Sequence, residues 1–257
     1  MYLRDKAIVL RQKPFREHDS IVVLFGRVHG KLEVLARGAK KSNAKQAGHL
    51  EPFSEVDVMI AKGKSLDKLA VAKILDPHAA LRKRLSMLAV CGAFCDLVDR
   101  LTRPGQADPL IYDLLDEALG LAQATEAEPS PERSRLLFAA ASLKLLDLLG
   151  YALHMDRCIA CRQPLADPCA FVSDAGGFLC STCLRERRRD FPKAEQLPHH
   201  ALSILRFLRL KPLKNVLGLT ATTEIFAAAS SVVEQSLSHA PLEKEAHGPR
   251  TISAMLA

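Results

Sequence analysis

Four cysteines in two closely spaced pairs are the residues of this chain best suited to metal chemistry. Cys158 and Cys161 form one Cys-x-x-Cys pair, and Cys180 and Cys183 form a second pair eighteen residues further on. Each pair places two thiolates beside one ion, and the turn at residues 174–177 can return the second pair to the first. Four sulfur ligands fill a tetrahedral site and leave no position for water. We therefore expect one structural zinc ion, not a catalytic one.

The other cysteines of the seven in the chain fit a different role. Cys169 lies between the two pairs without a partner of its own, so we exclude it from the site. Cys91 and Cys95 are four residues apart on the apolar stripe of an expected helix, where a third ligand is missing, and we interpret them as core residues. The sequence shows no signal peptide and no membrane span, which predicts reduced cysteines and a cytoplasmic protein.

Positive charge is concentrated at the front of the chain. The net charge is +7, and residues 1–80 carry 15 Lys plus Arg against 9 Asp plus Glu. A basic segment of this kind either contacts phosphates or is simply a solvated surface. The candidate nucleic-acid contacts are Arg16, Arg27, Lys31, Arg37, Lys40, Lys41 and Lys45. A second candidate cluster directly follows the last cysteine and comprises Arg185, Arg187, Arg188 and Arg189.

The elements that must position these basic residues are short strands. Apolar or β-branched runs occupy residues 7–10, 20–25, 31–36, 55–61 and 69–75, with glycines between several of them. Leu32, Val34 and Ala36 alternate with Glu33, as in a strand with one buried face. Five strands without intervening helices predict a small closed sheet, and an OB-type barrel is one natural solution. Such barrels bind nucleic acid, which favours the phosphate-contact interpretation.

Helical periodicity replaces the strands after Pro77. Apolar stripes predict helices at about residues 81–98, 110–122, 134–149, 199–210 and 220–238, with the cysteine pairs between the third and the fourth. The predicted fold class is therefore α+β, with two domains. Residues 1–78 form a five-stranded OB-type barrel, and residues 79–240 form an α-helical domain whose four-cysteine zinc module spans 155–190. Residues 241–257 are expected to be a mobile tail.

No catalytic motif emerges from the sequence. There is no P-loop, no dinucleotide-binding glycine motif, no His-Glu-x-x-His and no Gly-x-Ser-x-Gly. A zinc-containing nuclease or ligase stays open as an alternative. However, a ligase needs a Lys-x-Asp-Gly lysine that this chain lacks, and the carboxylates a nuclease would cluster are scattered. A protein-interaction scaffold whose charge only aids solubility is the other alternative.

The order of these parts resembles the RecO family, the bacterial recombination mediators of DNA repair, over nearly the whole chain. The front carries Gly26-Arg27-Val28-His29-Gly30-Lys31, then Ala36-Arg37-Gly38-Ala39-Lys40-Lys41 and Gly48-His49-Leu50-Glu51-Pro52-Phe53. The second part carries Leu149-Gly150-Tyr151, Asp156-Arg157-Cys158-Ile159-Ala160-Cys161 and Gly176-Gly177-Phe178-Leu179-Cys180. The segment at residues 215–238 departs from that family, because it is longer and richer in Ala and Ser.

The resemblance implies a function as well as a fold. It implies a non-enzymatic protein that binds single- and double-stranded DNA and anneals complementary strands. It further implies association with RecR and with single-stranded DNA-binding protein, so that recombinase is loaded onto coated strands. The expected compartment is the bacterial cytoplasm, at the nucleoid when the protein acts.

Overall fold

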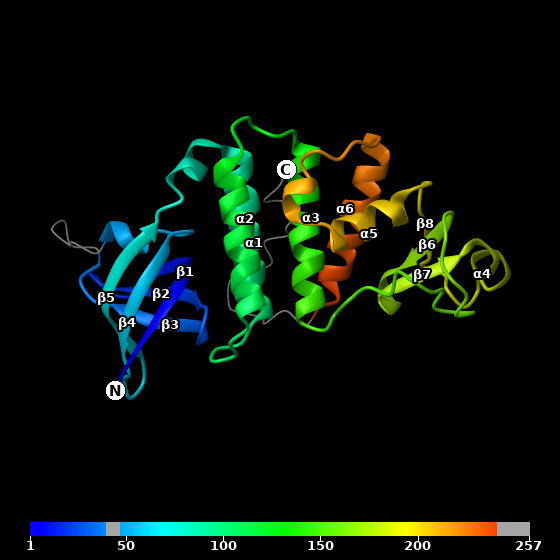
Figure 1. Cartoon of the computed structure of the whole chain (residues 1–257). Helices are drawn as coiled ribbons and strands as arrows, with labels where there is room; N and C mark the ends of the chain where they lie inside the picture. The colour runs from blue at the N-terminus through cyan, green and yellow to red at the C-terminus, as the bar shows by residue number, and fades with distance from the viewer. Residues whose placement is uncertain (40–46, 241–257) are drawn as a thin grey trace. The chain divides into compact units, whose positions relative to one another are not determined.

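The computed structural model describes residues 1–39 and 47–240, which form two compact units. The first unit is Met1–Glu128 and the second begins at Pro129. The first holds a barrel and two helices, and the second holds helices and a small sheet with the cysteines (Figure 1). The α+β fold class predicted from the sequence is confirmed. The boundary at residue 78 stays a prediction, and the two helices after it pack with the barrel in the first unit.

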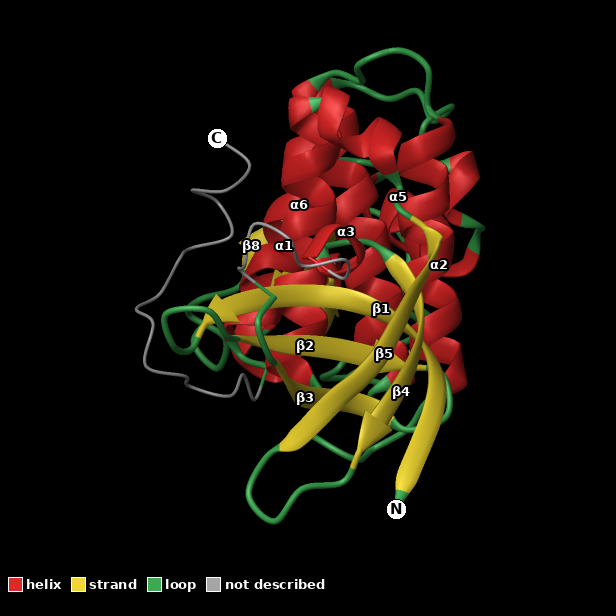
Figure 2. Cartoon of the chain, turned by 90° about the vertical axis from the view of Figure 1, so that its left-hand side faces the viewer, coloured by secondary structure: helices red, strands yellow, loops and turns green. Residues whose placement is uncertain are grey.

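Five strands of the first unit close into a barrel in the order β1-β2-β3-β5-β4 (Figure 2). All neighbours are antiparallel except β3 and β5, which pair in parallel. This is the closed five-stranded sheet that the strand pattern predicted. The strands are β1 (Tyr2–Pro14), β2 (Ser20–Gly26), β3 (Gly30–Ala36), β4 (Glu55–Ala61) and β5 (Asp67–Asp76), with the short helix η1 (Ala47–Leu50) before β4.

The barrel interior is built by alternation along each strand. Val22 and Leu24 of β2 point inward with Val34 of β3, and all three are fully buried. Val56, Val58 and Ile60 of β4 complete this core. Because side chains alternate across a strand, each inward residue leaves its neighbours on the outer surface of the barrel.

Two helices cover one part of that outer surface. Helix α1 (Leu85–Leu101) and helix α2 (Pro109–Ala124) follow the short η2 (Ala79–Lys83) and pack against β1. Ile8, Val23 and Phe25 point out of the barrel, yet all are fully buried. They belong to a second apolar layer, between the outer faces of β1 and β2 and the helices. The first unit is thus a closed barrel whose outer surface is covered by helices on one side.

The second unit combines a helical bundle with a three-stranded sheet of order β7-β6-β8. Helix α3 begins with Pro131 after the N-cap Ser130, and Gly150, at φ +83, follows its end. It packs against α5 and α6. The elements are α3 (Pro131–Leu148), β6 (Cys169–Val172), η3 (Ser173–Ala175), β7 (Gly177–Cys180), α4 (Ser181–Glu186), β8 (Glu195–Gln196), α5 (Ala201–Leu210), η4 (Leu213–Asn215) and α6 (Thr223–Ser238). Among the described residues, no helix has both the length and the apolarity needed to cross a bilayer.

Candidate metal centre and nucleic-acid surfaces

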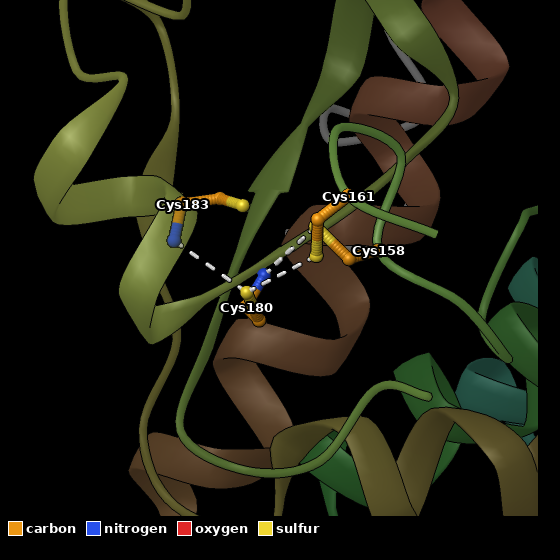
Figure 3. A group of neighbouring side chains, drawn as sticks. All are labelled: Cys158, Cys161, Cys180 and Cys183. Atoms are coloured by element: carbon orange, nitrogen blue, oxygen red, sulfur yellow. Dashed lines mark hydrogen bonds between the residues drawn. The ribbon is translucent and has the colours of Figure 1, made fainter. Parts of the chain in front are cut away.

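The two cysteine pairs meet in the second unit. Cys158 and Cys161 come from the loop after α3, Cys180 ends β7, and Cys183 lies in α4 (Figure 3). All four sulfur atoms lie within 4.8 Å of one another. The chain turns back because Gly176 adopts a left-handed conformation at φ +58, and because Gly177 leaves room for the side chain of Ile159.

The sulfur geometry matches a tetrahedral site. A Zn–S bond of about 2.3 Å places two sulfur ligands about 3.8 Å apart. Cys161 Sγ and Cys180 Sγ lie 3.9 Å apart. Backbone N–H groups also point at the sulfurs, since Cys180 N donates to Cys158 Sγ at 3.4 Å and Cys183 N donates to Cys180 Sγ at 3.5 Å. The four side chains therefore fit one metal ion of thiolate-binding type.

Backbone N–H groups also favour ionisation at one ligand. Burial opposes ionisation of Cys158, but backbone donors, those of Cys161 and Cys180 first among them, outweigh it and lower its pKa to about 6. Burial and hydrogen bonds to the other thiols raise the pKa of Cys183. A bound cation would stabilise all four thiolates together, which is the usual condition for this ligand set.

The remaining cysteines lie outside this group. Cys169 is buried in β6, opposite Cys180 in the strand register, and burial raises the pKa of its thiol to about 12. Cys91 and Cys95 lie in the buried side of α1. Among the described residues, the four-cysteine set is the one group of three or more His, Cys, Asp or Glu side chains close enough to share an ion.

Three of the predicted phosphate contacts are accessible on the first unit. Arg16 is exposed and lies over the ring of Phe15, and Arg37 is exposed directly after β3. Arg27 is about half exposed, and its guanidinium pairs with Asp113 of α2 at 3.1 Å. Arg27 is therefore partly neutralised within its own unit. Lys40, Lys41 and Lys45 lie outside the described residues.

Lys31 occupies a different place from the one expected of a phosphate contact. Lys31 is only 3% exposed to solvent. Its Nζ donates to the main-chain oxygen of Asp99 at 2.6 Å and pairs with the Asp99 carboxylate at 2.7 Å. Arg11 pairs with the same carboxylate. Lys31 lies on the outer face of β3, where α1 covers it. The lysine thus binds the end of this helix instead of solvent.

The arginines after the cysteines are all exposed, but they differ in their partners. Arg187 pairs with Asp190 at 2.9 Å, and Arg188 donates to the carbonyl of Ala194 at 3.2 Å. Arg185 and Arg189 make no ion pair within the described part of the chain. The cluster therefore offers two free guanidinium groups beside the metal centre.

Sequence reasoning missed a set of cations on the outer face of the barrel. Arg4 and Lys6 alternate with inward residues of β1, while Lys68 and Lys73 lie on β5, and all four are exposed. The signal was present in β1, where Arg4, Lys6 and Ile8 alternate with Leu3, Asp5 and Ala7.

Comparisons with known proteins cover both units. The family model "Recombination protein O N terminal" matches residues 1–78, and "Recombination protein O C terminal" matches residues 82–241. A DNA repair protein RecO of Geobacter sulfurreducens is 35% identical over 206 residues, which are 80% of this chain and 82% of the relative. Another from Desulforudis audaxviator is 29% identical over 250 residues, 97% of this chain and 94% of the relative.

The regions matched by the two family models therefore include the barrel, the helices and the four-cysteine segment. A third relative, the DNA repair protein RecO of Symbiobacterium thermophilum, is 34% identical over 70% of both chains. Because the second family model alone spans more than half of the residues, the chain belongs to the RecO family of DNA repair proteins.

Proposed function

We propose that this protein is a non-catalytic DNA-binding mediator of recombinational repair. It binds single- and double-stranded DNA and anneals complementary strands. With RecR, it helps to load recombinase onto strands coated by single-stranded DNA-binding protein, in the bacterial cytoplasm at the nucleoid. The observation that carries this proposal is the net positive charge of residues 1–80, placed on an OB-type barrel in a chain of a DNA repair family.

Electrostatics explain how such a barrel promotes annealing. Two strands repel each other through their phosphates, and each lysine or arginine bound to a phosphate releases condensed counterions. Arg16 and Arg37 are exposed on the described barrel, and Lys40, Lys41 and Lys45 belong to the same basic segment. Neutralising both strands on one protein lowers their repulsion. Aromatic side chains for stacking are few, so binding is expected to depend mainly on charge.

Salt titration tests this mechanism directly. Binding of the full chain to a fluorescein-labelled oligothymidylate is measured from low to physiological salt, together with annealing of complementary strands. We expect steep salt dependence, and we expect Lys40→Glu/Lys41→Glu to reduce the slope of log K against log salt by about 1.4, or 0.7 per phosphate contact. A salt-independent affinity of the wild-type chain would refute DNA binding through charge.

A matched variant separates local contacts from total charge. Lys83→Glu/Arg103→Glu makes the same change in net charge at two exposed cations that lack an ion pair among the described residues. We expect this control to leave the slope near that of the wild-type chain. Equal effects of the two double variants would assign the binding to net charge alone and not to the basic segment.

For the four-cysteine site we propose one structural zinc ion. Its support is the sulfur separation of 3.9 Å and the four-thiolate ligand set, which closes the coordination sphere. Zinc content per chain is measured after denaturation with a colorimetric chelator. Cys180→Ser is expected to lose the ion, and Cys169→Ser is expected to keep it. The opposite result would move the site to a different set of ligands.

Two further assays address the partners and the absence of catalysis. Arg185 and Arg189 are proposed as additional phosphate contacts beside the zinc. Co-sedimentation with RecR and with single-stranded DNA-binding protein tests the proposed assembly. Incubation of labelled DNA with magnesium or manganese tests for cleavage, and strand scission that co-purifies with the wild-type chain would replace the mediator by a nuclease.

A further inference from the structure

The barrel presents two outer faces with very different surroundings. OB barrels usually bind oligonucleotides on the face of strands 2 and 3. Here Val23 and Phe25 of β2 are fully buried on that face, and Lys31 of β3 is buried beside them. Helices of the same unit cover it. A nucleic acid therefore needs another surface of the barrel.

The outer face of β1, β4 and β5 (Figure 2) remains exposed over the part that carries residues 2–6 of β1, 57–61 of β4 and 68–73 of β5. The strand registers align its side chains in three cross-strand rows. Along β1 and β4 each row is two residues, or about 6.8 Å, from the next, whereas a register shift makes the step from Lys68 to Val71 on β5 three residues long. Each row contains at least one basic residue. The rows are Tyr2–Ala61–Lys68, Arg4–Met59–Val71 and Lys6–Asp57–Lys73.

The cations at the two edges of this face are not equivalent. On β1, Arg4 pairs with Asp57 at 2.5 Å, and Lys6 pairs with Glu55 at 2.5 Å. On β5, Lys68 and Lys73 are exposed and form no direct ion pair among the residues that the structure describes, although Lys73 lies opposite Asp57 and helps to lower the pKa of that carboxyl. Free positive charge is thus concentrated along β5.

The β4–β5 connection extends this line of charge. Lys62 is held by Asp67 at 2.7 Å, whereas Lys64 is exposed and, within the described ranges, unpaired. Three exposed lysines without a direct ion pair among the described residues therefore follow one another from the connection along β5. A polyanion lying along this strand would meet all three without breaking an existing ion pair.

Apolar side chains lie among the charged ones on all three strands. Tyr2 is 67% exposed, Met59 is 38% exposed and Val71 is 47% exposed. Nucleobases stack on aromatic rings and contact apolar side chains, and this binding tolerates any sequence. The face thus supplies what a single strand needs: lysines for its phosphates and an apolar strip with one aromatic ring for its bases.

A protein segment fits this face less well. The middle strand of this face, β4, pairs with β1 on one side and with β5 on the other, so a peptide strand cannot add at the centre of the face. An uncharged partner would also remove water from three lysines along one side without replacing it by negative charge, which costs free energy. Charge complementarity therefore favours nucleic acid over a second copy of the chain.

From these observations we propose that single-stranded DNA binds the outer face of β1, β4 and β5, with Lys64, Lys68 and Lys73 on its phosphates and Tyr2 against a base. This rests on the proposed function, because it requires that the chain bind DNA. It names a surface distinct from the basic segment at residues 37–45.

The first test compares three double variants of the full chain with the labelled oligothymidylate. Lys68→Glu/Lys73→Glu is expected to raise the Kd at least tenfold and to reduce the salt slope by about 1.4. Lys83→Glu/Arg103→Glu, with the same charge change outside the sheet, is expected to stay near the wild-type slope. The proposal is overturned if the β5 variant weakens binding no more than this control.

A second test needs no charged variant. A strand that contains 5-iodouridine is irradiated with the wild-type chain, and the crosslinked residue is identified by mass spectrometry. We expect a crosslink at Tyr2. We also expect Tyr2→Ala to weaken binding about five- to 150-fold, whereas Tyr2→Phe, which keeps the aromatic ring, should retain most of the wild-type affinity. Crosslinks confined to residues 37–45 would overturn this surface but leave the proposed function standing.

Two other outcomes are separated by the same measurements. A wild-type chain that fails to bind the oligothymidylate at low salt would remove the proposed function together with this surface. Analytical ultracentrifugation of the wild-type chain and of Lys68→Glu/Lys73→Glu reports on self-association. If the variant alters the oligomeric state and leaves DNA affinity unchanged, the face is an interface between copies, and the proposal is overturned.

Discussion

Replacement of Lys31 by methionine tests whether this lysine holds the barrel to its helix. Methionine keeps most of the aliphatic length but removes the ammonium group. In the folded chain, both the lysine and the Asp99 carboxylate have side chains only 4% exposed, and they pair at 2.7 Å. The ammonium also donates to the Asp99 carbonyl at 2.6 Å, close to the end of α1. Its loss therefore affects a charge and a helix terminus together.

The magnitude follows from what remains after the substitution. Removing one partner of a buried ion pair costs about 3–5 kcal/mol. Arg11 still pairs with Asp99, so we expect the lower end, about 3 kcal/mol. At roughly 3 °C per kcal/mol, the melting temperature of the first unit should fall by about 10 °C. Lys68→Met, at an exposed position of β5, should change stability by less than about 0.5 kcal/mol.

Thermal and urea unfolding followed by circular dichroism measure both variants. A double-mutant cycle with Asp99→Asn sharpens the result, because two residues in contact should couple by about 0.5–3 kcal/mol. DNA affinity, measured where all variants are folded, should be the same for Lys31→Met and the wild-type chain. The reasoning is refuted if Lys31→Met melts like the wild-type chain and binds DNA more weakly, since Lys31 would then be a phosphate contact.

Three further changes probe the same unit and the metal centre. Gly30→Ala should destabilise the first unit by about 3 kcal/mol in urea unfolding, because Gly30 has φ +66 and a Cβ there would overlap the carbonyl of Gln106. Tyr112→Phe should cost about 1–3 kcal/mol by the same measurement, because the phenol donates at 2.6 Å to the buried Glu55 carboxylate. Zinc chelation should abolish protection of the β6–β7 amides in hydrogen exchange and leave the barrel amides protected; uniform loss of protection would contradict a local role for the ion.

Alternation of side chains made the barrel predictable. Leu32, Val34 and Ala36 alternate with Glu33 and are inward residues of β3, and each expected strand is present. Which residues of β5 face outward was harder to predict from the sequence. Its pairing with β4 shifts register between Met59 and Ile60, so a simple period of two fails along this strand.

The covered face was missed because its cause lies far away in the sequence. Lys31 pairs with a residue 68 positions later, and no local pattern marks that contact. One signal was nevertheless present: residues 21–25 are apolar without interruption. A strand that is apolar on both faces is buried on both faces, and this predicts a covering layer outside the barrel. For the cysteines the spacing alone sufficed, because both pairs and the returning turn are local.

The same covering layer determines where a nucleic acid can bind. Ile8, Val23 and Phe25 are fully buried between the barrel and its helices. Exposing three such side chains costs about 1.5–3 kcal/mol each, or roughly 5–9 kcal/mol together, before the Lys31–Asp99 pair is broken. A ligand that first opened this face would bind at least 10³-fold more weakly than one that used an open surface. The helices thus stabilise the barrel by occupying the face that OB barrels usually use for binding, and this cost would direct DNA, if it binds as proposed, to the surfaces that are already exposed.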